Sequence, residues 1–140
     1  MAGDAHELAL RSLRTRDRSV QELDKRLAAS GADDEERAEV LESLQRTGLL
    51  DDRRFAEERA ASLARRSAGD ALIRHELAAA GVAAELVEGA LASLEPEIDR
   101  ARAIVERRGR DARTARYLAG KGFAGEVVGA VAGGAGDEIG

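Results

Sequence analysis

The stretch "IRHELAAAG", residues 73–81, decides the fold of this chain because its pattern occurs three times. An apolar residue, a leucine four positions later and a glycine four positions after that also occur in "LDKRLAASG" (23–31) and, with threonine first, in "TARYLAGKG" (114–122). Residues four positions apart share one face of a helix, and a glycine can close a helix in a left-handed conformation. The pattern therefore predicts three short helices that each end at a glycine.

Further apolar helices are expected on both sides of each copy. Residues 8–13, 55–63 and 98–105 precede the copies and carry apolar residues at spacings near three and four. The apolar residues that return after the glycines at matching offsets are Leu41 and Leu44, Leu91 and Leu94, and Val128 and Val131. The sequence therefore predicts an all-α fold of nine helices in three tandem three-helix repeats of helix-turn-helix type. We expect the repeats at residues 1–48, 49–95 and 96–132, and a flexible tail at 133–140.

Polar residues mark the starts of several predicted helices. Ser19 with Glu22 three positions later has the signature of a capping box, and Asp33 with Glu36 repeats that spacing. Pro96 can occupy the first turn of a helix, where its missing N–H group is not needed. These starts agree with the helix order that the repeat predicts.

The stretch "GLLDDRRF", residues 48–55, joins the first repeat to the second. Asp51 or Asp52 can accept the free N–H groups of a new helix and complement its dipole. We expect Leu49, Leu50 and Phe55 to form the seam between the two repeats. A pair of carboxylates at a helix start is more often a cap than a metal site or an acid–base pair, so the structural interpretation is favoured.

The composition argues against an enzyme. The only aromatic residues are Phe55, Tyr117 and Phe123, so the core must be thin and a large ligand cavity is not expected. Neither His6 nor His75 has a cysteine or another histidine at metal-ligand spacing. The sequence contains no phosphate-binding loop, dinucleotide fingerprint or nucleophile elbow. We therefore predict a protein that is not an enzyme and has no cofactor and no metal.

Compartment is predicted from what the sequence lacks. Cysteine is absent, which fits a reducing interior. No apolar run approaches the roughly 18 residues that span a bilayer, and the N-terminal residues lack the basic-then-apolar order of a secretory signal. We expect a cytoplasmic protein with no membrane contact.

Charge is unevenly distributed along the chain, whose net charge is −5. Residues 20–52 carry ten acidic and four basic side chains, whereas residues 98–123 carry three acidic and eight basic ones. The acidic balance argues against strong, indiscriminate DNA binding, but the basic stretch leaves room for a local contact with phosphate or with an acidic protein surface. The alternative is that the basic residues are solvated helix faces. The candidate partner- or DNA-binding residues are Arg14, Arg16, Arg18, Arg65, Arg66, Arg74, Arg107, Arg108, Arg113 and Lys121.

Four stretches stand out in order along the chain: "RTRDRSVQELDKRL" (14–27), "GLLDDRRFA" (48–56), "GDALIRHELAAAGV" (69–82) and "LAGKGF" (118–123). Together they resemble the RecX family of bacterial recombination regulators, and the resemblance covers roughly residues 8–131. The motif residues expected to have structural roles are Ser19, Glu22, Leu23, Leu50, Asp51, Asp52, Phe55, Glu76, Leu77, Gly81, Gly122 and Phe123. Arg37 departs from the family pattern, which has an aliphatic residue there, so the resemblance implies a shifted or looser third helix.

The resemblance also implies a fold and a partner. The fold is an elongated, curved array of three-helix repeats that lies in the groove of the RecA nucleoprotein filament. There the family modulates RecA in homologous recombination, DNA repair and the SOS response, usually by inhibiting its ATPase, strand exchange and filament extension. Contact with single- or double-stranded DNA is expected to be weak for the chain alone, and we expect a monomer.

Two other functions fit the sequence. A helix-turn-helix DNA-binding protein would show a duplex affinity that falls steeply with salt, and it needs base-reading side chains at a helix start. The acidic start at Asp33–Glu36 speaks against it. A passive helical scaffold would be insensitive to charge reversal at Arg107, Arg108 and Arg113.

Overall fold

The computed structural model describes residues 2–133, and this part of the chain is helical with no strand. The first module comprises α1 (Ala2–Thr15), α2 (Val20–Ala29) and α3 (Asp34–Arg46). The second module comprises α4 (Asp52–Arg65), α5 (Asp70–Ala79) and α6 (Ala84–Ala92). The third module comprises α7 (Glu97–Arg108), α8 (Ala112–Gly120), α9 (Gly125–Val128) and a π-helical turn η1 (Gly129–Gly133). Gly133, the first residue of the predicted tail, ends η1, and residues 134–140 of that tail lie outside the described residues.

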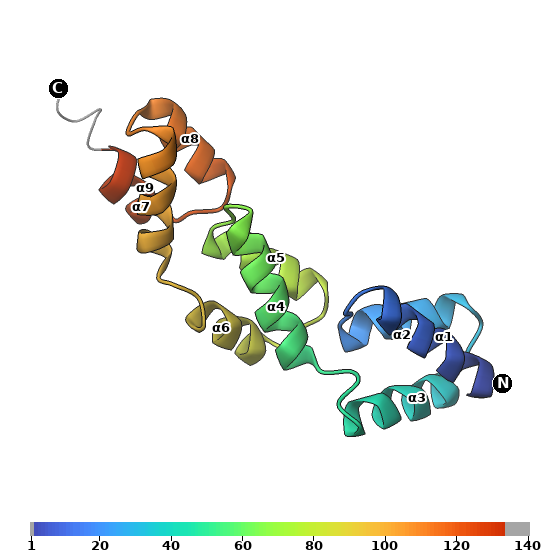
Figure 1. Cartoon of the computed structure of the whole chain (residues 1–140). Helices are drawn as coiled ribbons and strands as arrows, with labels where there is room; N and C mark the ends of the chain where they lie inside the picture. Colours follow the sequence, from blue (N-terminus) through green and yellow to red (C-terminus); the bar gives the residue numbers. More distant parts are fainter. Residues whose placement is uncertain (1, 134–140) are drawn as a thin grey trace.

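The three modules follow one another in a slender array rather than around one centre (Figure 1). Each module has its own cluster of buried apolar side chains, and no cluster draws buried residues from two modules. The clusters are built largely from alanine, leucine and valine, with one phenylalanine in each of the second and third modules. The sequence-based expectation of an all-α, elongated array of three-helix repeats is therefore confirmed.

The repeated pattern forms the centre of each module. The apolar or threonine residues of the pattern, which are all at most 2% exposed, are Leu23 and Leu27, Ile73 and Leu77, and Thr114 and Leu118. The glycine that follows each pair has a positive φ of 99°, 82° and 90° at Gly31, Gly81 and Gly122. An L-residue adopts this conformation only with strain, so glycine lets the chain reverse directly into the next helix.

The helix starts follow the predicted capping chemistry. Ser19 and Glu22 form a complete capping box, and the side chain of Asp33 accepts the N–H of Glu36. At α4 the cap is Asp51, which accepts the N–H groups of two following residues, while Asp52 is the first helical residue. Pro96 was expected in the first turn of a helix, but it stands one position earlier, as the N-cap of α7.

The seam predicted from Leu49, Leu50 and Phe55 is only partly correct. Leu50 is buried in the first module, and Phe55 is buried in the second. Leu49 is 52% exposed and belongs to neither core. The prediction failed there because apolar character does not show on which side of a tight turn a side chain lies.

Arg37 does not loosen the third helix of the first module. Its guanidinium donates to Asp24 at 2.8 Å, to the carbonyl of Ala32 at 2.7 Å and to Asp34 at 2.6 Å. The hydrogen bond to Asp24 is the main cause that holds the pKa of Arg37 above its usual value. A polar clamp between α2 and α3 therefore replaces the aliphatic contact, and α3 runs regularly from Asp34 to Arg46.

Candidate partner-binding surface

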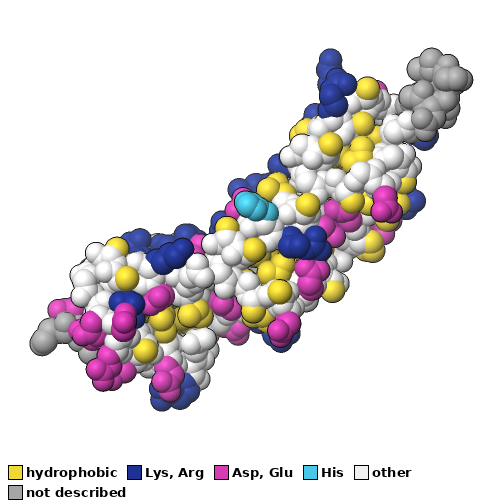
Figure 2. All heavy atoms as spheres, turned by 180° about the vertical axis from the view of Figure 1, so that it is seen from behind, with side chains coloured by type: hydrophobic (Ala, Val, Ile, Leu, Met, Phe, Trp, Pro, Cys, Tyr) yellow, Lys and Arg dark blue, Asp and Glu magenta, His cyan; other side chains and the backbone are white. Residues whose placement is uncertain are grey.

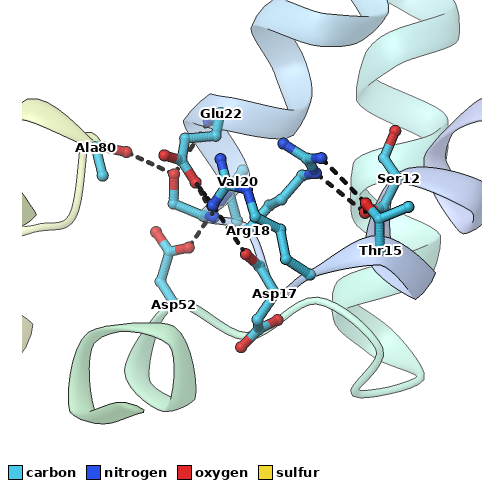
Figure 3. Close-up of polar contacts among 10 residues, drawn as sticks. Ser12, Thr15, Asp17, Arg18, Val20, Glu22, Asp52 and Ala80 are labelled. Atoms are coloured by element: carbon cyan, nitrogen blue, oxygen red, sulfur yellow. Dashed lines mark hydrogen bonds and ion pairs between the residues drawn. The ribbon is translucent and has the colours of Figure 1, made fainter. Parts of the chain in front are cut away.

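The first module is joined to the second through the start of α2 (Figure 3). The buried hydroxyl of Ser19 donates to the carbonyl of Ala80 at 2.6 Å, just before the glycine turn of the second module. The N–H of Val20 donates to the carboxylate of Asp52 at 2.8 Å. The capping box of α2 therefore has a second role, because Ser19 accepts the N–H of Glu22 and also fastens two modules together.

The environment of Asp52 at this joint disfavours the ionised form of its carboxyl group. Burial is the main cause that raises the pKa of Asp52, and the hydrogen bond from Val20 works in the opposite direction. The neighbouring carboxylate of Asp51 raises it further. Since Asp51 caps the helix, Asp52 contributes to docking between modules rather than to capping.

The second module is joined to the third in a corresponding way. The N–H of Gly69 donates to the carbonyl of Lys121 at 2.8 Å, and the N–H of Ala71 donates to the carbonyl of Gly122 at 3.1 Å. The N–H of Asp70 donates to the carboxylate of Glu97 at 2.6 Å. The start of α5 therefore docks on the glycine turn of the third module.

The two joints use corresponding positions, although the N-cap donor is the Ser19 hydroxyl in the first and the Gly69 backbone N–H in the second. In each, the N-cap residue of a middle helix bonds to the carbonyl before the next module's glycine, and the first amide of that helix meets a carboxylate. That carboxylate is the first helical residue of the next module, Asp52 in α4 and Glu97 in α7. Repetition of one docking contact produces a regular array, as in other repeat proteins.

Arg100 adds a tie that is present only at the second joint. Its guanidinium donates to the carbonyls of Ala68 and Glu95, each at 2.9 Å, and pairs closely with the carboxylate of Asp70. It also lies 5.9 Å from the centre of the Phe123 ring. Arg100 and Glu97 were not predicted from the sequence, because each acts on a residue about thirty positions away. The matching positions of Asp52 and Glu97 in the repeat were the available signal.

The predicted motif residues occupy structural positions in this framework. Leu23, Leu50, Phe55, Leu77 and Phe123 are buried, Glu76 is half-buried on α5, and Gly81 and Gly122 close the turns that receive the neighbouring modules. Both joint glycines lie close to the preceding module: a Cβ on Gly122 would lie 2.7 Å from Leu72, and one on Gly81 would overlap the Gln21 side chain. These turns therefore need glycine for space as well as for conformation.

The predicted arginines of the first module differ in exposure and in whether they already have a polar partner. Arg14 is exposed and donates no hydrogen bond within residues 2–133. Arg16 is exposed but lies 3.7 Å from Glu22. Arg18 is half-buried and donates to the carbonyl of Ser12 at 3.1 Å, and burial is the main cause that lowers its pKa. Arg18 therefore stabilises the end of α1, and Arg14 is the cation most available to a partner.

The second module offers fewer available cations than predicted. Arg74 is fastened to both carboxylate oxygens of Glu88, at 2.7 and 3.0 Å. Arg66 donates to the hydroxyl of Ser62 at 3.2 Å, and Arg65 is exposed. Of the three predicted cations, Arg65 and Arg66 at the end of α4 have no carboxylate partner among the described residues, and exposed Arg53 at the start of α4 has none there either.

The third module carries the most accessible positive charge. Arg107 and Arg113 are exposed and donate no hydrogen bond within the described residues. Arg108 lies 3.6 Å from the centre of the Tyr117 ring, so the ring orients this guanidinium. Lys121 is half-buried at the second joint. Further exposed arginines of this module are Arg102, Arg110 and Arg116.

The two ends of the array therefore differ in charge. Figure 2 shows Asp and Glu side chains gathered toward the end of the molecule that the first module forms. The start of α3 contributes Asp33, Asp34 and Glu35, all exposed. A helix start with this charge repels a phosphate backbone, which argues against a recognition helix at this place.

Residues 2–133 contain neither a metal-binding cluster nor a membrane-spanning helix. No group of three or more histidine, cysteine or carboxylate side chains there could hold a metal ion. None of the helices described is both long and apolar enough to cross a membrane.

The fold and its surface define a class of protein: a slender all-α array of three-helix modules that offers charged surface and fixed joints. Comparison with known proteins identifies the class further. Residues 51–91 match the family model described as "RecX, second three-helix domain". The chain is 40% identical over 129 residues to the regulatory protein RecX of Chromohalobacter salexigens, covering 86% of this chain and 85% of that protein. It is 36% identical over 137 residues to that of Acidithiobacillus ferrooxidans, covering 89% and 86%.

Solved structures agree with the fold. The crystal structure of RecX from Lactobacillus salivarius superposes with a TM-score of 0.80 over 93% of each chain, at 17% sequence identity. The chain belongs to the RecX family of regulatory proteins.

Proposed function

We propose that this chain binds the RecA nucleoprotein filament and inhibits its ATPase, strand exchange and filament extension in recombination and DNA repair. The observation that carries the proposal is membership of the RecX family over most of the chain, at 36–40% identity to regulatory proteins of that name. The partner and the direction of the effect are what the family resemblance implies.

The shape of the array supports binding to a long helical partner. Three modules in a slender line can each make a modest contact, and the contacts reinforce one another through effective concentration. The repeated joints hold the modules at fixed relative positions, so less conformational entropy is lost on binding than with flexible linkers. An extended groove is a better match for this shape than a compact pocket.

The charge distribution supports contact with a protein–DNA assembly rather than with DNA alone. Arg107 and Arg113 can approach phosphates or acidic protein surface, whereas the acidic first module opposes any duplex that spans the whole array. We therefore expect weak DNA affinity for the isolated chain and stronger binding when RecA coats the DNA.

The test is a titration of the chain into RecA, single-stranded DNA and ATP at two salt concentrations, with ATP hydrolysis and filament binding both measured. The expected result is a fall in hydrolysis at substoichiometric or near-equal amounts of chain. An unchanged rate without binding would overturn the proposal. Binding with an unchanged or increased rate would overturn inhibition alone.

A further inference from the structure

Leu49 is the only large apolar side chain among the described residues that is exposed, at 52%. It lies in the turn between α3 and α4, and its neighbour Leu50 is buried in the first module. A single exposed leucine is common on protein surfaces, so exposure alone indicates no function. Leu49 differs from a scattered surface leucine because it lies in a fixed turn and beside an apolar groove.

The turn that carries Leu49 is fixed on both sides. The N–H of Leu50 donates to the carbonyl of Leu44 at 3.0 Å. The guanidinium of Arg54 donates to the carbonyls of Gly48 and Leu49 at 2.8 and 3.1 Å. The backbone at Leu49 is therefore held in place before any partner arrives, which lowers the entropy cost of using it in an interface.

Leu49 lies at the edge of an apolar groove. Leu10 and Leu13 of α1 line the groove with it, and Arg14, Asp17 and Arg54 complete the lining. Both leucines of α1 are half-buried, so apolar surface continues from Leu49 onto α1. An apolar centre with a charged rim is the usual anatomy of a protein–protein contact.

The charged rim indicates which occupant fits. Arg54 is committed to the turn and lies 3.6 Å from Asp17, whose Oδ2 is buried and accepts no hydrogen bond within residues 2–133. Arg14 remains as the available cation. A nucleic acid backbone needs several free cations, which this groove lacks. An apolar side chain beside a carboxylate fits, because the carboxylate can pair with Arg14.

A second copy of this chain does not supply that occupant. The only exposed large apolar side chain it offers, within the described residues, is Leu49 itself. A symmetric contact between two such leucines would bring the arginines of two grooves together, which is unfavourable. The occupant is therefore a different protein.

We infer that the groove formed by Leu10, Leu13, Leu49 and Arg14 binds an apolar side chain with a neighbouring carboxylate on the surface of a RecA protomer in the filament. The inference rests on the proposed function and names the protein contact within it. In this inference the first module makes an apolar contact with the filament, and the third module makes separate cationic contacts. Leu49 is the anchor of this contact, and Arg14 sets which partner segments are accepted.

The test compares variants in binding to RecA filaments assembled on single-stranded DNA. Since the chain has no cysteine, a fluorophore can be placed by Ala92→Cys, on an exposed residue of the second module. Leu49→Ala is expected to weaken filament binding about tenfold, from loss of the exposed part of one leucine. Leu49→Asp is expected to weaken it further, because it repels the partner's carboxylate. Leu94→Ala is the control for truncating a leucine away from the groove; because Leu94 packs against the core of the second module, urea unfolding checks that this variant stays folded.

The outcomes separate this inference from the proposed function. Weaker filament binding by both Leu49 variants, with normal helicity, normal affinity for DNA alone and a normal Leu94→Ala control, supports the groove. If both Leu49 variants bind the filament as tightly as the wild-type chain, the groove assignment is wrong and the proposed function still stands. A wild-type chain that does not bind the filament overturns the proposed function, and the groove assignment with it.

Discussion

Gly69→Ala tests whether the modules are rigidly docked. Gly69 has φ −84° and ψ 172°, an extended conformation that alanine adopts without strain. A Cβ at this position would lie 2.4 Å from the backbone nitrogen of Phe123 and 2.6 Å from the carbonyl oxygen of Gly122. The overlap with the third module is therefore the main effect of the substitution, and the preference of an N-cap for glycine over alanine adds a smaller cost.

The expected cost follows from these distances. Atoms in ordinary contact are about 3.5 Å apart, so the third module must retreat by about 1 Å. That movement strains or breaks the hydrogen bonds from Gly69 to Lys121 and from Ala71 to Gly122. Each contributes about 1 kcal/mol, and the remaining overlap adds a similar amount, so the free energy of unfolding falls by about 2–4 kcal/mol.

Urea unfolding followed by circular dichroism measures this cost, and small-angle scattering measures the accompanying change in shape. Gly89→Ala is the matched control, because Gly89 lies in α6 with no atom within 4 Å of a built Cβ. That variant should gain about 0.5–1 kcal/mol from helix propensity. If Gly69→Ala unfolds at the wild-type urea concentration and scatters identically, the close docking of the modules is refuted.

Three further predictions concern the joints and the charged surface. Ser19→Ala removes a cap and the buried bond to Ala80, and should lower the free energy of unfolding by about 1–3 kcal/mol in urea titration; a loss below 0.5 kcal/mol, on the order of a surface change, would count against the joint. Burial raises the pKa of Asp52, so the folded chain binds this proton more tightly than the unfolded chain and wild type should gain stability relative to Asp52→Asn as pH falls from 7 to 4; a flat or opposite difference would disprove the assignment. Replacing Arg107 and Arg113 together with glutamate should weaken filament binding and flatten its salt dependence, whereas a passive scaffold would show no change.

The sequence was sufficient to predict the interior of each module. The spacing of Leu23, Leu27 and Gly31 identifies a buried helix face and a left-handed turn, because both depend on residues close together in the chain. The caps at Ser19 and Asp51 were predictable for the same reason. Local rules therefore determine most of the helix order.

The joints and the free surface were not predictable in this way. Arg100 has the same residue type as exposed Arg102, yet it is held by Ala68, Asp70 and Glu95 at the second joint. Leu49 has the same residue type as buried Leu50, yet it faces solvent. These roles depend on which module lies alongside, and a spacing rule within one module contains no such information.

Cosedimentation measures whether the chain binds RecA filaments in preference to DNA. The chain is centrifuged with RecA filaments assembled on single-stranded DNA with a non-hydrolysable ATP analogue, and in parallel with DNA alone and with RecA alone. We expect the chain to pellet with the filament in a saturable manner and to remain largely in the supernatant with DNA alone. A chain that stays in the supernatant with the filament, or that pellets equally with naked DNA, would contradict this expectation.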